Sequence, residues 1–490
     1  MKRQLSGDER SFLGRACEQI YANPFEMSAG MPEIPWGTPP GTVMADVGGD
    51  HPLGSLGRAV DEFISQMDVR GPVRLRDFSP ADAELVSHSL LFQVYHRHVD
   101  DMNRHIVGQM DAPERLQAVS YAPSMLEALA ERGFTPRQSE RYLALFFQLR
   151  RAYYFIDETL VGDCPSMSRL RQNLWAAVFS NDARRYDRFL WNRMEDFSIL
   201  LLGPTGSGKG VAAAAIGRSA YIPYDAGRRR FAENFAANQI QANLSEYPEN
   251  LIESALFGHR KGAFTGAVDT HQGLFQRCTP HGCLFLDEIG DISASVQVKL
   301  LRVLQERRFT AVGSHDTRQF SGRLITATHR DMDALRAEGG FRDDLYYRLS
   351  ALVIEIPSLH QRIRESAGEL DRMIELLVAR TLGNPDPEIT AGIRQSLSEQ
   401  LPADYSWPGN VRELEQAVRR TLLAMPFTPA MAKPPAGDSM IASLMRDQPT
   451  AKALLGEYCS ALYAVYGGYE EVARRVGLDR RTVKKHLGQG

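Results

Sequence analysis

A glycine-rich loop in the middle of the sequence has the spacing of a phosphate-binding site. An apolar run, 197–202, precedes the loop, and an alanine-rich segment, 211–218, follows it. This order predicts a buried strand, a tight loop and a helix N-terminus, whose amide groups and dipole bind anions. The loop comprises Gly203, Pro204, Thr205, Gly206, Ser207, Gly208 and Lys209. Gly210 follows where such loops carry a serine or threonine hydroxyl for Mg²⁺.

Two adjacent carboxylates, Asp287 and Glu288, end a second apolar run, 283–286. Such a run predicts a buried parallel strand, and ligands of open α/β sheets bind at the carboxyl ends of the strands. Asp287 is expected to hold Mg²⁺, directly or through water, and Glu288 to deprotonate a water that attacks a phosphate. A capped strand end would explain one carboxylate, but not a pair downstream of a phosphate loop. The two motifs together predict ATP hydrolysis, with ATP and Mg²⁺ as cofactors.

A short loop bracketed by glycines lies between these two motifs. It comprises Gly262, Ala263, Phe264, Thr265, Gly266 and Ala267. Such a loop cannot bury the phenyl ring of Phe264 against itself, and exposed aromatic residues commonly mark a partner surface. A turn packed on the protein core is the alternative.

Length and composition bound the class of protein. The chain has 490 residues, enough for about three domains. Its net charge of −3 indicates that any nucleic-acid surface is local. Five scattered cysteines and the lack of a long apolar run predict a cytoplasmic protein with no membrane segment. Cys278, His281 and Cys283 could suggest zinc, but without a second ligand pair buried thiols beside a strand are favoured.

Residues 1–158 are predicted to form a mostly helical regulatory region, with a loop rich in Pro and Gly between Met31 and Gly57. Hydroxyl residues followed by proline predict helix starts at Ser79 and Thr135. Of three histidines, only two share a helix face, so a metal site is not favoured; these are His96, His98 and His105. The arginine-rich stretch 228–238 is expected to be solvated.

The end of the chain is predicted to hold a DNA-binding domain. A Pro- and Ala-rich linker, 426–440, leads to a helix-turn-helix in residues 441–490, with its turn at Gly477. The last helix is basic, which suits contact with bases and phosphates in double-stranded DNA, although a solvated terminal helix is the alternative. The expected DNA-binding residues are Arg480, Arg481, Thr482, Lys484, Lys485 and His486.

These motifs together resemble the bacterial enhancer-binding proteins, AAA+ ATPases that activate sigma-54 RNA polymerase. Residues 262–267 match the family's GAFTGA loop letter for letter, and further matches lie at 248–251, 296–306, 341–349 and 407–414. The resemblance covers about residues 160–425. It implies a parallel-sheet α/β subdomain over 159–362, a helical lid over 363–425, and a GAFTGA loop that contacts sigma-54 in the polymerase holoenzyme.

The resemblance also implies roles for single residues. Asn243 aligns with the asparagine that couples Glu288 to the nucleotide state, and Arg412 with an arginine of the lid that contacts nucleotide. Arg342 and Arg348 align with arginines that reach the ATP of a neighbouring subunit, which implies a homo-oligomeric ring, expected to be a hexamer.

Two positions depart from the family. Gly210 stands where the family usually has glutamate, and His329 where asparagine is common. These departures keep open a DNA-binding regulator with a degenerate ATPase. A AAA+ remodeller of another client is the second alternative.

Overall fold

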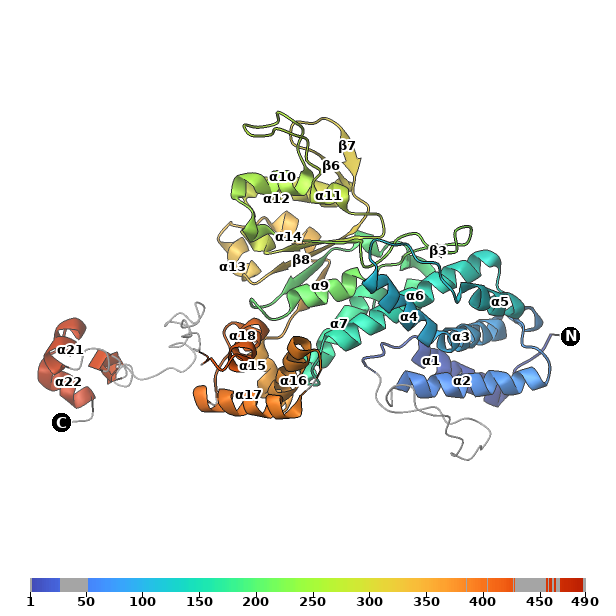
Figure 1. Cartoon of the computed structure of the whole chain (residues 1–490), viewed down its shortest axis with the longest axis horizontal. Helices are drawn as coiled ribbons and strands as arrows, with labels where there is room; N and C mark the ends of the chain where they lie inside the picture. Colours follow the sequence, from blue (N-terminus) through green and yellow to red (C-terminus); the bar gives the residue numbers. More distant parts are fainter. Residues whose placement is uncertain are drawn as a thin grey trace. The chain divides into compact units, whose positions relative to one another are not determined.

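The computed structural model describes residues 2–26, 52–384, 386–402, 404–425, 427, 455–456, 458–460, 462–463 and 468–487 (Figure 1). The chain divides into two compact units, Met1–Phe427 and Thr428–Gly490. The predicted linker, 426–440, lies outside the described residues except for Phe427.

A five-stranded sheet forms the centre of the first unit, and all of its strands are parallel. The strand order is β4-β5-β8-β1-β9, where the strands are Gln239–Asn243, Cys283–Asp287, Arg323–Thr328, Ile199–Leu202 and Leu352–Glu355. The apolar runs predicted to be strands lie at β1 and β5, and β8 is buried along its whole length. The predicted parallel-sheet α/β fold is therefore confirmed.

Alternate residues of the strands face two different cores, as the two-residue period of a strand requires. Leu200 and Leu284 pack in a core with α10 (Glu249–Phe257), α12 (Ala294–Glu306) and α14 (Asp343–Leu349). On the other face, Ile199 and Phe285 share a core with α7 (Pro165–Phe179), α9 (Lys209–Gly217) and the N-terminal helices. Two smaller helices are α11 (Leu274–Arg277) and α13 (Met332–Ala337).

The N-terminal region consists mainly of α-helices, as predicted. These are α1 (Gly7–Ile20), α2 (Pro52–Val69), α3 (Pro80–Arg97), α4 (Val99–Asp111), α5 (Ala122–Arg132) and α6 (Pro136–Thr159). Ser79 and Thr135 cap α3 and α6, as their sequence predicts. Residues 52–57, expected in a loop, instead begin α2, and most of the remaining predicted loop lies outside the described residues.

The arginine-rich stretch 228–238 is not a solvated segment. It contains β3 (Arg230–Phe231), which pairs with β2 (Tyr224–Asp225) in an antiparallel hairpin. Arg228 and Arg229 are exposed, but Phe231, Asn234 and Phe235 are buried. The three successive arginines suggested a solvated segment, but the two phenylalanines that follow them are buried.

The segment predicted to be a lid, 363–425, contains α16 (Glu369–Leu382), α17 (Pro387–Gln400) and α18 (Asn410–Leu422). Helix α15 (Leu359–Glu365) crosses the predicted boundary, and Leu359 packs in the same core, so the name lid is used here for α15 to α18. Trp407 lies in its core with Leu414 and Val418. Among the described residues of the second unit, α21 (Tyr469–Val476) and α22 (Arg480–His486) pack around Val472 and Val483. In the part of the chain that is described, none of the helices has the length and apolar character needed to span a membrane.

Candidate nucleotide site

The phosphate loop connects the end of β1 to the first residue of α9, as predicted. Gly206 and Gly208 have φ of 75° and 106°, a left-handed conformation that favours glycine. A Cβ added at Gly206 would lie 2.4 Å from the carbonyl oxygen of Gly409, so the lid leaves no room for a side chain there. The loop is thus shaped by glycine both in its own backbone and in its contact with the lid.

Lys209 is buried, with 5% of its surface exposed. Its Nζ donates to the carbonyl oxygens of Gly203 at 2.9 Å and Pro204 at 3.3 Å. Burial lowers the pKa of Lys209, while the carboxylates of Glu288 and Asp287 raise it, which places all three charges in one site. Ser207 Oγ is buried without a hydrogen-bond partner among the described residues. An unpaired buried hydroxyl is costly, so its position suits an acceptor on a bound phosphate.

The two carboxylates lie at the carboxyl end of β5, level with Asn243 on β4. Burial raises the pKa of Asp287, and the Glu288 amide, which donates to Asp287 Oδ1 at 3.0 Å, opposes that rise. Glu288 itself has φ 56° and ψ 47°, which is unusual for a residue with a side chain. Such strain is common at functional sites, where it aims a side chain.

His329 follows β8 and contacts the catalytic candidate directly. Its Nδ1 lies 2.7 Å from Glu288 Oε2, and its backbone N–H donates to the same oxygen at 3.2 Å. Asn243 Oδ1 instead accepts from the Ser245 amide at 3.2 Å, and its Nδ2 donates to Glu246 at 3.4 Å. In this structure the partner of Glu288 is therefore the histidine.

The lid contacts the phosphate loop through its turn at 407–410. Asn410 Nδ2 donates to the carbonyl of Thr205 at 3.0 Å, and its Oδ1 accepts from the Leu359 amide at 2.9 Å. One side chain thus ties the loop, the lid and the start of α15 together. The sequence shows Asn410 within a motif, but its two-sided role depends on a left-handed backbone, φ 52°, that composition does not reveal.

Of the predicted arginines, Arg412 lies at this site and the other two do not. Arg412 affects the pKa values of Lys209 and Asp287, although its side chain is exposed. Arg342 and Arg348 lie on or beside α14 with exposed side chains. Arg342 donates to Asp344 at 2.7 and 3.0 Å, and Arg348 has no hydrogen-bond or ion-pair partner among the described residues.

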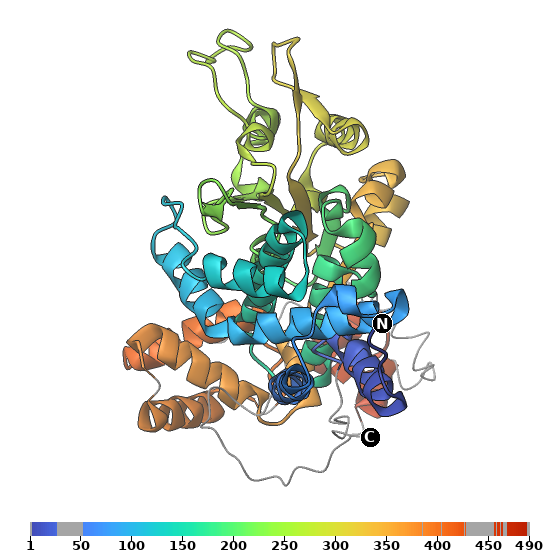
Figure 2. The same cartoon turned by 90° about the vertical axis from the view of Figure 1, so that its right-hand side faces the viewer.

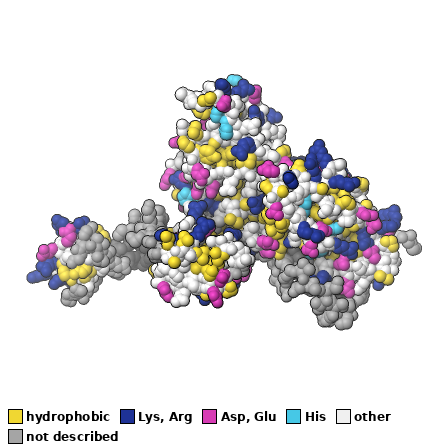
Figure 3. Space-filling view, in the orientation of Figure 1, with side chains coloured by type: hydrophobic (Ala, Val, Ile, Leu, Met, Phe, Trp, Pro, Cys, Tyr) yellow, Lys and Arg dark blue, Asp and Glu magenta, His cyan; other side chains and the backbone are white. Residues whose placement is uncertain are grey.

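The loop 262–267 projects with the hairpin of β6 (Arg308–Thr310) and β7 (Thr317–Gln319) from one end of the first unit (Figure 2). Gly262 N–H donates to Ala267 at 2.8 Å and closes the loop. Phe264 is 37% exposed, and its ring centroid lies 4.9 Å from that of His259. The ring is therefore only partly covered, and histidine side chains gather at this end of the molecule (Figure 3).

The predicted DNA-binding residues lie on α22, as the sequence suggests. Gly477 ends α21 in a left-handed conformation, φ 73°, and Asp479 caps α22 by accepting from the Thr482 amide. Val483 faces the core, while Arg480, Arg481 and Lys485 are on the outside or partly exposed.

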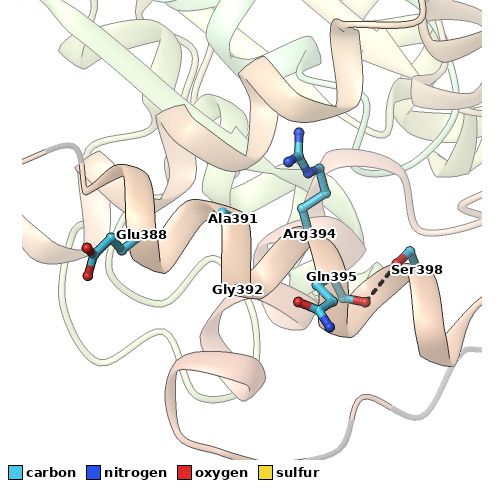
Figure 4. Close-up of a pocket in the computed structure, with 6 residues that line it drawn as sticks. All are labelled: Glu388, Ala391, Gly392, Arg394, Gln395 and Ser398. Atoms are coloured by element: carbon cyan, nitrogen blue, oxygen red, sulfur yellow. Dashed lines mark hydrogen bonds between the residues drawn. The ribbon is translucent and has the colours of Figure 1, made fainter.

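Two other features contain none of the residues predicted for the nucleotide site. Cys283 begins β5, and Cys278 is the C-cap of α11. Burial raises the pKa of Cys278 to about 12. In the described part of the chain no group of three or more His, Cys, Asp or Glu is arranged to hold a metal ion. A hollow on α17 contains none of the predicted residues (Figure 4). All the side chains that line it come from this one helix: Glu388, Ala391, Gly392, Arg394, Gln395 and Ser398.

Comparison with known proteins gives one family and several relatives. The profile of the Sigma-54 interaction domain matches residues 184–355. A transcriptional regulatory protein ZraR from Klebsiella oxytoca is 36% identical over 344 residues, which cover 67% of this chain and 68% of that protein. The Nif-specific regulatory protein of Azotobacter vinelandii is 37% identical over 276 residues, 56% of this chain and 46% of the relative.

Two further similarities extend over more of the chain. The C4-dicarboxylate transport transcriptional regulatory protein DctD of Rhizobium meliloti is 32% identical over 393 residues, 77% of this chain and 76% of that protein. A crystal structure of NtrX from Brucella abortus in complex with ATP has a TM-score of 0.41 and 22% identity, and covers 75% of this chain and 80% of that one.

Proposed function

The chain belongs to the sigma-54-dependent transcriptional activators, and from this membership we propose how its own residues perform the family's ATP-dependent activation. Residues 203–209 bind the phosphates of ATP, Glu288 activates the hydrolytic water, and the loop 262–267 carries the resulting movement to sigma-54. The observation that supports this most is the meeting of Lys209, Asp287 and Glu288 at the carboxyl edge of the parallel sheet.

The roles of the site residues follow from their chemistry. Lys209 neutralises the outer phosphates, and the buried hydroxyl of Ser207 donates to a phosphate oxygen. Glu288 takes a proton from the water that attacks the γ-phosphorus. His329 Nδ1 lies 2.7 Å from one of the two carboxylate oxygens, Oε2, and the other oxygen is proposed to take the proton.

The donor set fits Mg²⁺, which prefers oxygen ligands and keeps several waters. Asp287 would hold the ion, whose chemistry is to neutralise charge on the phosphates. Gly210 supplies no side-chain ligand, so water is expected to complete the coordination of the ion.

Arg342 and Arg348 are proposed to act in a neighbouring subunit, because both are exposed and neither lies at its own phosphate loop. This assigns the active state to a ring, expected to be a hexamer. The cationic α22 is proposed to bind upstream double-stranded DNA as the second helix of a helix-turn-helix, in a cytoplasmic protein.

Transcription from a sigma-54 promoter with purified components tests the proposal. The wild-type protein is expected to open the promoter only with ATP. Glu288→Gln should keep ATP binding but lose turnover by a factor on the order of 10² or more. Promoter opening without hydrolysable ATP would contradict the proposal.

A variant of the projecting loop separates hydrolysis from output. Thr265→Ala should keep ATP hydrolysis and lose sigma-54 binding and promoter opening. Thr270→Ala is the matched control, because Thr270 lies in the same projection and accepts from the Lys261 amide. If Thr265→Ala and Thr270→Ala activate equally well, the loop is not the contact.

A DNA-binding regulator with a degenerate ATPase is the second candidate. The glycine at position 210 and the pairing of Glu288 with His329 favour it. Absence of ATP turnover by the purified wild-type ring, together with intact DNA binding, would select this alternative.

A further inference from the structure

The chain at the end of the helix that follows the phosphate loop is hydrogen-bonded by side chains of the N-terminal region. Helix α9 ends at Gly217, and the next three carbonyl groups belong to Arg218, Ser219 and Ala220. All three accept hydrogen bonds from side chains of α6, which lies beside α9 (Figures 1 and 2). Arg218 is the C-cap of α9, and Ser219 and Ala220 follow it, so α6 holds the chain at and just beyond the end of the helix.

Arg151 supplies two of the three bonds. Its guanidinium donates to Arg218 at 2.7 Å and to Ala220 at 2.7 Å, and the side chain has no exposed surface. No carboxylate pairs with Arg151 among the described residues. A positive charge at a helix C-terminus interacts favourably with the helix dipole, and this interaction offsets part of the cost of burying the charge.

Gln148, one turn earlier on α6, supplies the third bond. Its Nε2 donates to the carbonyl of Ser219 at 2.9 Å, and its Oε1 accepts from the Tyr186 hydroxyl at 2.7 Å. Because Gln148 is itself fixed from both sides and is 1% exposed, it has no freedom to follow α9 if that helix moves.

The ATPase domain supplies a cap in the opposite direction. Asn234 Nδ2 lies 3.1–3.3 Å from the carbonyl oxygens of Gln109, Ala112 and Arg115, at the end of α4. Phe231 stacks on Phe147 of α6 with centroids 4.4 Å apart. Each region thus donates hydrogen bonds to carbonyl groups at or just beyond the end of a helix in the other.

We propose that α6 influences ATP binding at the phosphate loop. In this proposal Arg151 and Gln148 are positioning residues that set the affinity of the loop for ATP by holding the far end of α9. The inference rests on the proposed function, since it requires that the loop binds ATP. Helix α9 is short and buried, so a displacement at Ser219 is carried along its axis to Lys209. A signal received by the N-terminal helices would act on ATP binding through this contact.

The test measures the dissociation constant of a fluorescent ATP analogue for full-length variants whose folding is checked by circular dichroism. Arg151→Met removes both bonds and is expected to raise the dissociation constant about fivefold or more. Arg151→Lys keeps the charge but lacks the planar guanidinium group, so its dissociation constant should lie between those of wild type and Arg151→Met.

Arg150→Met is the matched control. Arg150 lies on the same helix but donates to Asn103 and stacks on Tyr153, both within the N-terminal region. It should lower the melting temperature without changing the dissociation constant. If Arg151→Met does not fold, Arg151→Lys and Gln148→Met decide by the same titration.

The outcomes separate the two proposals. A folded Arg151 or Gln148 variant that binds the analogue as tightly as wild type, while its melting temperature falls, would overturn the inference and leave the proposed function intact. A wild-type protein that does not bind the analogue would overturn both.

Discussion

The N-terminal helices and the C-terminal helices differ in the core that each uses. Phe147 and Phe155 of α6 belong to the same hydrophobic cluster as Ile199 and Phe285 of the sheet. The C-terminal unit has a separate small cluster, in which the buried residues described are Cys459, Val472, Ala473 and Val483. A shared core transmits displacement because close-packed interiors deform little. The second unit, whose last helix is proposed to bind DNA, has a core of its own.

This difference suits the predicted regulatory region and the predicted DNA-binding domain to different tasks. The N-terminal helices are suited to change the ATPase itself, through α6 and α9. The C-terminal unit is suited to raise the local concentration of the ATPase at a promoter. The predictions that follow test whether the two ends respond as differently as their cores suggest.

The largest effect is expected from a truncation in the shared core. Phe231→Ala removes the ring stacked on Phe147, and should lower the free energy of unfolding of the first unit by about 3–5 kcal/mol. Loss should appear together in the N-terminal helices and in ATP binding. Denaturant unfolding, followed by circular dichroism and by binding of the ATP analogue, measures both.

Val483→Ala is the corresponding change in the second unit. Its side chain is fully buried, and its loss should weaken DNA binding while ATP turnover is unchanged. If Phe231→Ala left ATP binding intact, or Val483→Ala abolished turnover, the contrast between the two cores would be wrong.

A smaller effect is expected at the polar cap that the ATPase gives to α4. Asn234→Ala leaves buried carbonyl groups without a donor and should cost about 1–3 kcal/mol. Asn192→Ala, at an exposed position of the same unit, is the control and should stay within about 0.5 kcal/mol of wild type. Equal melting temperatures for the two variants would show that the cap contributes nothing.

Whether a feature can be predicted from the sequence depends on how far apart in the chain its contacting residues lie. The apolar strands β1 and β5, the phosphate loop and the caps at Ser79 and Thr135 depend on neighbouring residues, and the sequence predicts them. The contact between α6 and α9 joins residues far apart in the chain, such as Arg151 and Ala220. Spacing on one helix does not identify such a partner, so the apolar stripe of α6 indicates only a core.

Within the site the same distinction holds. The pattern around Asp287 and Glu288 predicts the strand and its two carboxylates. It does not predict that His329 binds Glu288, because that pairing depends on a left-handed backbone at Glu288. The positions of Arg342 and Arg348 are consistent with the surface of α14, and their proposed action in a neighbouring subunit stays a prediction.

Acid should destabilise the first unit through a buried histidine. Burial and, to a smaller extent, the charge of Arg151 together lower the pKa of His105 from 6.5 to about 4. The folded protein therefore binds this proton more weakly than the unfolded chain. The contribution is fully present above pH 6.5 and is lost as the pH falls toward 4, at no more than about 1.4 kcal/mol per pH unit.

Chemical denaturation at pH 7, 6 and 5 measures this dependence. His105→Gln, which cannot titrate, should show a shallower fall in the free energy of unfolding than wild type. Identical slopes for the two proteins would remove His105 from the acid response.

The smallest effect concerns the two ends of α9 itself. Gly210 lies in its first turn, at a φ that is not left-handed, and an added Cβ would meet only Gln241 and Phe285 at 3.9 and 4.0 Å. Gly210→Ala should therefore raise the free energy of unfolding of the first unit by about 0.5–1 kcal/mol, because alanine loses less backbone entropy in a helix. Gly217→Ala is the same substitution at the other end, where a Cβ would lie 3.1 Å from both Cβ and Sγ of Cys283. It should destabilise the unit, because the end held against α6 and the sheet has no room to adjust. Thermal unfolding of the two variants tests the difference in sign. If Gly217→Ala stabilised the protein as much as Gly210→Ala, the far end of α9 would not be held as tightly as its contacts indicate.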